Sequence, residues 1–191
     1  MVRLHIYIVI QDIKINIAKD GSTFIKDSVS DVMMSLVLGS ILAVLITYLF
    51  LQNGRATLIG ALTIPTSLIA TFFLMQIMDF TLNTMSLMAL SLAVGIVIDD
   101  AIVVVENIYR HMEEGKSAFA AARDATNQLS MAIIATTLTL LAVFVPVGSM
   151  NGIVGQFFKQ FGLTVSFAVV FSTFVAFTLT PMLAAYFLKP T

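Results

Sequence analysis

Two adjacent carboxylates, Asp99 and Asp100, lie in the stretch LAVGIVIDDAIVVVEN (92–107), which is otherwise almost wholly apolar. Glu106 follows Asp99 by seven residues and Gly95 precedes it by four, so on a helix all three lie near one face. Carboxylates in such surroundings can bind and release protons, and a glycine on the same face lets another helix approach closely. These residue types therefore suggest proton binding inside an apolar helix.

Three interpretations of the aspartate pair are open from the residues alone. The pair could be a satisfied polar contact or a helix end, although the apolar residues continue beyond it. It could belong to an intramembrane aspartyl protease, but such a dyad faces across two helices, and adjacent residues on one helix point about 100° apart. No other apolar run supplies an aspartate. The pair could also couple ion movement to transport, since ionisable side chains inside a membrane are functional by default.

The composition shows what surrounds this helix. Of the 191 residues, 59% are hydrophobic and 11% are charged, whereas soluble domains carry about 25% charged residues. The net charge of −1 gives no reason to expect a nucleic-acid partner. The chain has no cysteine and only two histidines, which removes most metal-binding constellations. We therefore expect a membrane protein.

Five apolar runs approach the length of about 20 residues that crosses a bilayer. They predict an all-α bundle over residues 32–190, with spans at about 32–51, 56–77, 85–105, 130–147 and 161–188. The connector 107–128 carries three cations, and the positive-inside rule places it in the cytoplasm and residues 1–31 in the periplasm. Residues 11–20 alternate between polar and apolar as a strand does. We expect residues 1–31 to form a short extended segment that belongs to something larger.

Local signals refine this arrangement. Gly115 is typical of a helix stop, and Ser117 can cap a second, short helix within the connector. Pro65 and Pro181 are expected to kink or loosen their spans. The hydroxyls of ATTLTL (135–140) could bond across to the aspartates, but we favour bonds to their own backbone.

Longer stretches resemble the resistance–nodulation–division efflux pumps. LFLQNGRATLIGALTIPTSLIATF, NTMSLMALSLAVGIVIDDAIVVVENIYRHMEEG and FKQFGLTVSFAVVFSTFVAFTLTPMLAAYFLKP are similar to consecutive signatures of that family, and GSTFIKDSVSDV resembles the approach to its second membrane helix. The likeness covers residues 11–190. The G-x-x-x-D-D motif matches Gly95, Asp99 and Asp100, and the paired aspartates favour the hydrophobe/amphiphile (multidrug) branch.

The resemblance implies a role for each of these residues. The five spans would be the family's second to sixth helices, and Asp99 and Asp100 would be its proton relay. Residues 1–31 would be a remnant of the periplasmic porter region. The implied protein is a secondary transporter of the bacterial inner membrane rather than an enzyme, with protons as the coupling ion and no cofactor. The family implies a homotrimer with a periplasmic adaptor and an outer-membrane channel.

The sequence also departs from the family pattern. The lysine partner of the relay belongs to the family's tenth helix, and no predicted span here contains a lysine. The aspartates would thus be a half-site, which we expect to be protonated in the absence of that cation. Glu106 is either part of a proton exit route or an interfacial charge.

Two functions stay open from the sequence. One is a piece of a proton-driven multidrug exporter that requires the remaining, lysine-bearing parts of the pump. The other is a truncated, non-transporting membrane remnant or assembly partner.

Overall fold

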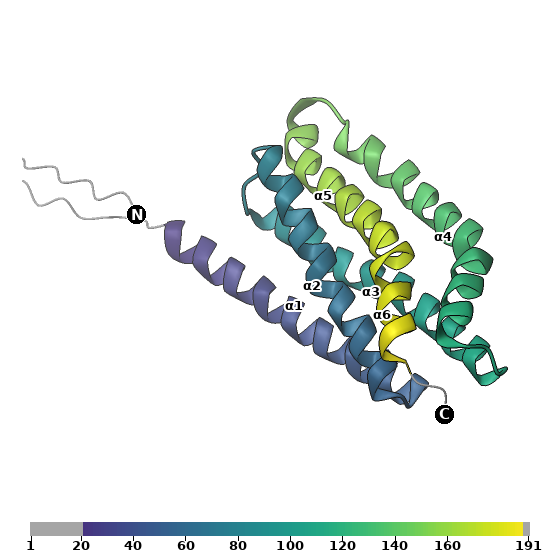
Figure 1. The fold of residues 1–191 in the computed structure, drawn as a ribbon. Helices are drawn as coiled ribbons and strands as arrows, with labels where there is room; N and C mark the ends of the chain where they lie inside the picture. The colour runs from purple at the N-terminus through teal and green to yellow at the C-terminus, as the bar shows by residue number, and fades with distance from the viewer. Residues whose placement is uncertain (1–20, 189–191) are drawn as a thin grey trace, which may run out of the picture.

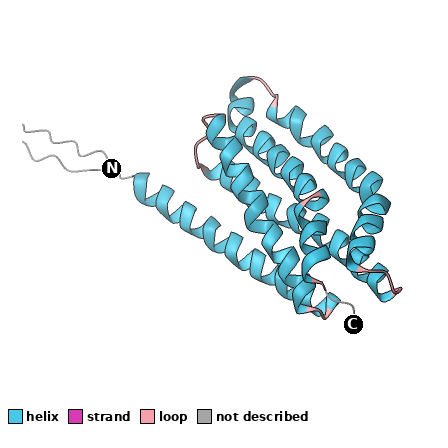
Figure 2. Ribbon diagram, viewed as in Figure 1, coloured by secondary structure: helices cyan, strands magenta, loops and turns pink. Residues whose placement is uncertain are grey.

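A computed structural model describes residues 21–188 as a bundle of helices (Figures 1 and 2). The helices are α1 (Gly21–Leu51), α2 (Gly54–Ile77), α3 (Thr84–Glu113), α4 (Ala118–Gly148), α5 (Gly152–Phe177) and α6 (Leu179–Phe187). The described part of the chain contains no strand. Counting α5 and α6 as one interrupted span, five segments are long and apolar enough to cross a membrane. The predicted all-α membrane bundle is confirmed.

The N-terminal prediction needs a correction. Helix α1 begins at Gly21, so residues 21–31 are helical, where we expected an extended segment. The segment from Val29 to Leu49 is long and apolar enough to cross a membrane. Helix α1 continues from this segment back to Gly21, over residues that are more polar. The strand predicted over residues 11–20 lies outside the described residues.

The connector between α3 and α4 is shorter than expected. Gly115 adopts a φ of +92°, a left-handed conformation that favours glycine, directly after α3 ends. The Ser117 hydroxyl accepts a hydrogen bond from the Ala120 amide at 3.4 Å, so both predicted helix signals are confirmed. The helix that Ser117 caps is not a separate short one, however. It is the first part of α4, which continues without a break into the fourth span.

The two prolines behave differently. Helix α2 runs continuously over Pro65. Near Pro181 the last span is interrupted at Thr178, which separates α5 from α6. Proline has no amide hydrogen to donate to the carbonyl four residues earlier, which is that of Phe177. The predicted loosening at Pro181 therefore occurs, and it divides the span into two helices.

Helix α3 lies at the centre of the bundle and contacts each of the other five helices. Its inward side chains, including Leu90, Val94 and Ile98, pack against Ile64 and Met75 of α2. The buried residues of α2 and α5 include many small or hydroxyl-bearing ones, whereas large apolar side chains such as those of Ile69, Phe73 and Phe174 are exposed. Small residues inside and large apolar residues outside are typical of helices that pack within lipid.

The two ends of the bundle differ in the cations that they carry. The α1–α2 loop, the α3–α4 loop and the end of α6 lie at one end of the bundle, and the other two loops lie at the opposite end (Figure 1). The first end carries Arg55, Arg110, Lys116 and Arg123, whereas Lys159 lies towards the second. By the positive-inside rule we expect the first end to face the cytoplasm, and this orientation stays a prediction.

Candidate functional site

The aspartate pair lies near the middle of α3, and that helix is well defined at both ends. At its start the Asn83 side chain accepts hydrogen bonds from the amides of Met85 and Ser86, and the Ser86 hydroxyl accepts one from the Asn83 amide. This capping box satisfies amides that would otherwise have no partner. At its other end Arg110 and His111 lie in the last turn, where cations interact favourably with the helix dipole.

The two carboxylates have different surroundings. Asp99 is exposed on the surface of the chain, and Asp100 is half-buried. The Ser172 hydroxyl of α5, which is only 2% exposed, donates a hydrogen bond of 2.8 Å to Oδ2 of Asp100. Asp100 is therefore joined to a neighbouring helix, whereas no side-chain hydrogen bond joins Asp99 to any residue between 21 and 188.

Both carboxylates line a cavity of about 380 Å³ between α3 and α4. On α3 the cavity is bordered by Ile96, Asp99, Asp100 and Val103, and on α4 by four apolar residues and Thr136. A volume of this size and polarity is enough for several water molecules. Because α4 contributes no carboxylate, the cavity lacks the facing aspartate that a protease dyad requires.

The threonine hydroxyls of α4 bond to their own backbone, as we favoured. Thr136 and Thr137 donate to the Ile133 carbonyl, and Thr139 donates to that of Ala135. Thr137 also lies 2.6 Å from the hydroxyl of Thr173 on α5. None of these hydroxyls bonds to an aspartate.

Neither Gly95 nor Glu106 joins the aspartate cavity. A Cβ added to Gly95 would meet no atom within 4 Å, so no described helix makes the close approach predicted there. The role of Gly95 in a close helix contact stays a prediction. Glu106 is exposed and lines a separate cavity of about 610 Å³, together with residues such as Tyr109 and Arg110. Its role as a proton exit stays a prediction.

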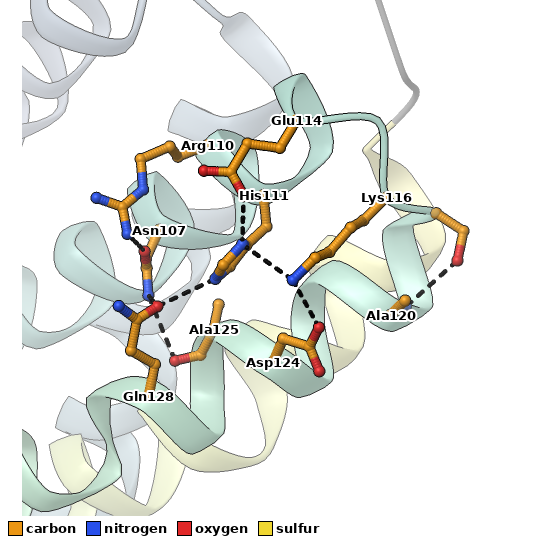
Figure 3. Close-up of polar contacts among 10 residues, drawn as sticks. Asn107, Arg110, His111, Glu114, Lys116, Ala120, Asp124, Ala125 and Gln128 are labelled. Carbon is orange, nitrogen blue, oxygen red and sulfur yellow. Dashed lines mark hydrogen bonds and ion pairs between the residues drawn. The ribbon is translucent and has the colours of Figure 1, made fainter.

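The ion pairs of the described residues lie away from the aspartates. Within residues 21–188, Lys116 pairs with Asp124, and the His111 imidazole contacts Glu114, both beside the α3–α4 loop. Figure 3 shows how they join the two helices: His111 also reaches Gln128, and the Lys116 ammonium lies 2.7 Å from Asp124. The hydrogen bond and the charge of Lys116 lower the pKa of Asp124. This cluster fixes the end of the helix that carries the aspartates.

Ser172 is the site residue that sequence reasoning missed. A hydroxyl in an apolar helix usually bonds to the carbonyl four residues earlier, as Ser166 and Thr173 do here. Nothing in the local sequence distinguishes Ser172 from those two residues. The only available signal was a polar residue within an apolar span.

Comparisons with known proteins agree with this arrangement. The profile of the AcrB/AcrD/AcrF family matches residues 3–191. The multidrug resistance protein MdtC of Pantoea ananatis is 46% identical over 178 residues, which are 93% of this chain and 17% of that protein. MdtC proteins of Yersinia enterocolitica and Escherichia coli O139:H28 are each 44% identical over 177 residues, which are again 93% of this chain and 17% of each relative. The chain thus spans about 17% of the length of these relatives.

The match covers the aspartate-bearing helix, its neighbours and the cytoplasmic connector. Together with five membrane-capable helices, it confirms the localisation expected from the sequence, a multi-pass protein of the bacterial inner membrane. The chain belongs to the AcrB/AcrD/AcrF family of resistance–nodulation–division transporters.

Proposed function

We propose that this chain supplies the proton-binding element of a proton-driven multidrug efflux transporter. The observation that carries the proposal is an aspartate pair at mid-helix that lines a cavity, with one member, Asp100, joined to α5 through Ser172. Burying one aspartate in a bilayer costs roughly 2.5–3.5 kcal/mol on insertion scales. A functional role explains two adjacent aspartates at that depth better than a purely structural contact does.

The proton cycle follows from electrostatics. A proton that arrives from the periplasm neutralises the aspartate pair and weakens its attraction to a cation on a neighbouring helix. The family resemblance implies that this cation is a lysine from the second half of the pump. Release to the cytoplasm restores the attraction. Each charge that crosses the membrane yields about 2.3 kcal/mol per 100 mV, which is enough to bias a conformational cycle.

Asp100 is suited to transmit the change. Its bond to Ser172 links the protonation state of α3 to α5, and α5 is interrupted at Thr178 just beyond. A change in that bond can therefore alter how α5 packs against α3. In the intact pump we propose that this movement drives the periplasmic porter region, within a homotrimer that assembles with an adaptor and an outer-membrane channel.

A chimeric transporter tests the proposal. The matched segment of Pantoea ananatis MdtC is replaced by this chain, and the chimera is expressed with the other components of that pump in a drug-sensitive strain. We expect the chimera to raise drug resistance. Asp99→Asn and Asp100→Asn should each reduce resistance to the level of the empty strain without lowering the amount of protein in the membrane, because a neutral amide inserts more readily than a carboxylate.

Asp79→Asn provides the matched control. Asp79 is an exposed carboxylate in the α2–α3 loop with a φ of +55°, a conformation that asparagine also tolerates. This variant should export drug normally. Normal export by the Asp99 and Asp100 variants would contradict the coupling role. A correctly inserted chimera that exports nothing would favour the non-transporting alternative.

A further inference from the structure

A groove of about 490 Å³ lies between the cytoplasmic part of α4 and the α5–α6 segment, away from the aspartate cavity. On α4 it is lined by Phe119, Arg123 and Thr126, which recur every three or four residues and so share one face. On α6 it is lined by residues that include Met182 and Tyr186. Helix α6 and the first part of α4 lie towards the end of the bundle that carries the α1–α2 and α3–α4 loops, which we expect to face the cytoplasm (Figure 1).

The groove contains one charged side chain among its described lining residues, that of Arg123. Arg123 is exposed, and it makes no hydrogen bond or ion pair with any residue from 21 to 188. The adjacent carboxylate, Asp124, is held by the Lys116 ammonium at 2.7 Å. The charge of Arg123 also helps to lower the pKa of Asp124, but Arg123 makes no ion pair with that carboxylate. The donors of its guanidinium are therefore available to a further partner of opposite charge.

Aromatic side chains form the rim of the groove. The rings of Phe119 and Tyr186 meet edge to face with centroids 5.3 Å apart, yet the two residues are 61% and 71% exposed. Tyrosine is one of the residues enriched at the level of the lipid headgroups, which suits Tyr186 to that depth. Phe177 lies nine residues before Tyr186 and lines the same groove, so the apolar wall extends about 13 Å along the span towards the bilayer interior.

We propose that this groove binds one anionic phospholipid of the cytoplasmic leaflet. The guanidinium of Arg123 holds the phosphate, because its planar donors match phosphate oxygens in a bidentate manner. Phe119 and Tyr186 flank the glycerol region, and an acyl chain lies along Met182 and Phe177. The gradient from a cation at the surface to apolar side chains below matches the gradient along a phospholipid. This binding is independent of the proton-coupling proposal.

The absence of tryptophan from the chain permits a direct test. Phe119→Trp introduces a single tryptophan at the rim of the groove, which can be excited selectively over the four tyrosines, and the full chain carrying it is placed in phosphatidylcholine vesicles. Phosphatidylglycerol with brominated acyl chains, a fluorescence quencher, is then compared with brominated phosphatidylcholine. We expect the anionic lipid to quench more strongly at equal content. Leu138→Trp, at an exposed position further along α4, should be quenched equally by both lipids.

A second substitution identifies the group responsible. In the Phe119→Trp background, Arg123→Gln should reduce the preference for the anionic lipid about fivefold, the effect expected of one basic residue near an anionic surface. Arg55→Gln removes an exposed arginine from the same end of the bundle but outside the groove, and should leave the preference unchanged. Equal quenching of the rim fluorophore by the two lipids would overturn the proposal. So would an equal loss in the Arg55 variant, or displacement of the lipid by inorganic phosphate, which would identify a site for free anions.

Discussion

Removing the Ser172 hydroxyl is the sharpest available test of the aspartate site. Ser172→Ala deletes one oxygen from a side chain that is 2% exposed, so the surrounding packing changes little. What it removes is the 2.8 Å hydrogen bond to Asp100, together with the link between α3 and α5 that this bond provides.

The size of the effect depends on the charge of Asp100. A hydrogen bond between neutral groups contributes about 0.5–1.5 kcal/mol, and one to an ionised group about 1.5–3 kcal/mol. Side-chain hydrogen bonds measured within a membrane protein average about 0.6 kcal/mol and reach about 1.7 kcal/mol. We therefore expect a coupling energy between Ser172 and Asp100 of about 0.6–1.5 kcal/mol if Asp100 is protonated, and a larger one if it is ionised.

A double-mutant cycle measures this coupling. The free energy of unfolding is determined in mixed micelles for the unsubstituted chain, for Ser172→Ala, for Asp100→Ala and for the double variant. The cycle isolates the interaction from the cost of each truncation. Ser166→Ala is the matched control, because Ser166 is also buried on α5 but donates to the Gly162 carbonyl of its own helix. The Ser166 variant should show no coupling to Asp100.

A coupling energy within about 0.3 kcal/mol of zero would refute the reasoning, since this is the limit within which independent sites add. Equal coupling for Ser166 and Ser172 would refute it as well, because only one of them contacts the carboxylate.

Further predictions concern the connector and the helix crossings. Lys116→Met should raise the pKa of Asp124 towards its ordinary value, which an NMR titration of the carboxylate can follow. Because Lys116 lowers the pKa of Asp124, the ion pair stabilises the folded chain above the unfolded pKa of about 3.9, and this stabilisation is lost as the pH falls through the lower pKa of the folded state. If the unsubstituted chain and the Lys116→Met variant differed equally in unfolding free energy at every pH in this range, the ion pair would be contradicted. Gly115→Ala should cost about 1–2 kcal/mol of unfolding free energy, because φ is +92° there. Gly162→Ala should cost at least about 1–3 kcal/mol, since the new Cβ would lie 2.5 Å from a backbone nitrogen of α4. A Cβ added to the helical residue Gly60 would meet no atom within 4 Å, so Gly60→Ala should be neutral or stabilising. A loss of unfolding free energy as large as that of Gly162→Ala would contradict the steric argument.

The helices were predictable because their signals are local. A bilayer requires about 20 apolar residues for each crossing, and the capping residue Ser117 and the left-handed Gly115 mark where α3 ends and α4 begins. The exact lengths were less predictable. Helices α3 and α4 continue beyond the apolar runs, because a helix needs no hydrophobicity once its backbone bonds are satisfied, and residues 21–31 join α1 for the same reason.

The sequence by itself determined the class of protein and the number of apolar spans, and it singled out the aspartates that we propose to bind protons. These follow from composition and from the cost of placing a carboxylate in lipid, both of which are properties of the residues alone. Only the tertiary structure decided that Asp100 is bonded to Ser172 while Asp99 is not, that both face a cavity towards α4, and that Glu106 faces a different one. The two aspartates are neighbours in sequence with the same chemistry. What distinguishes them is which helix packs against each, and that depends on residues far along the chain, such as Ser172 on α5.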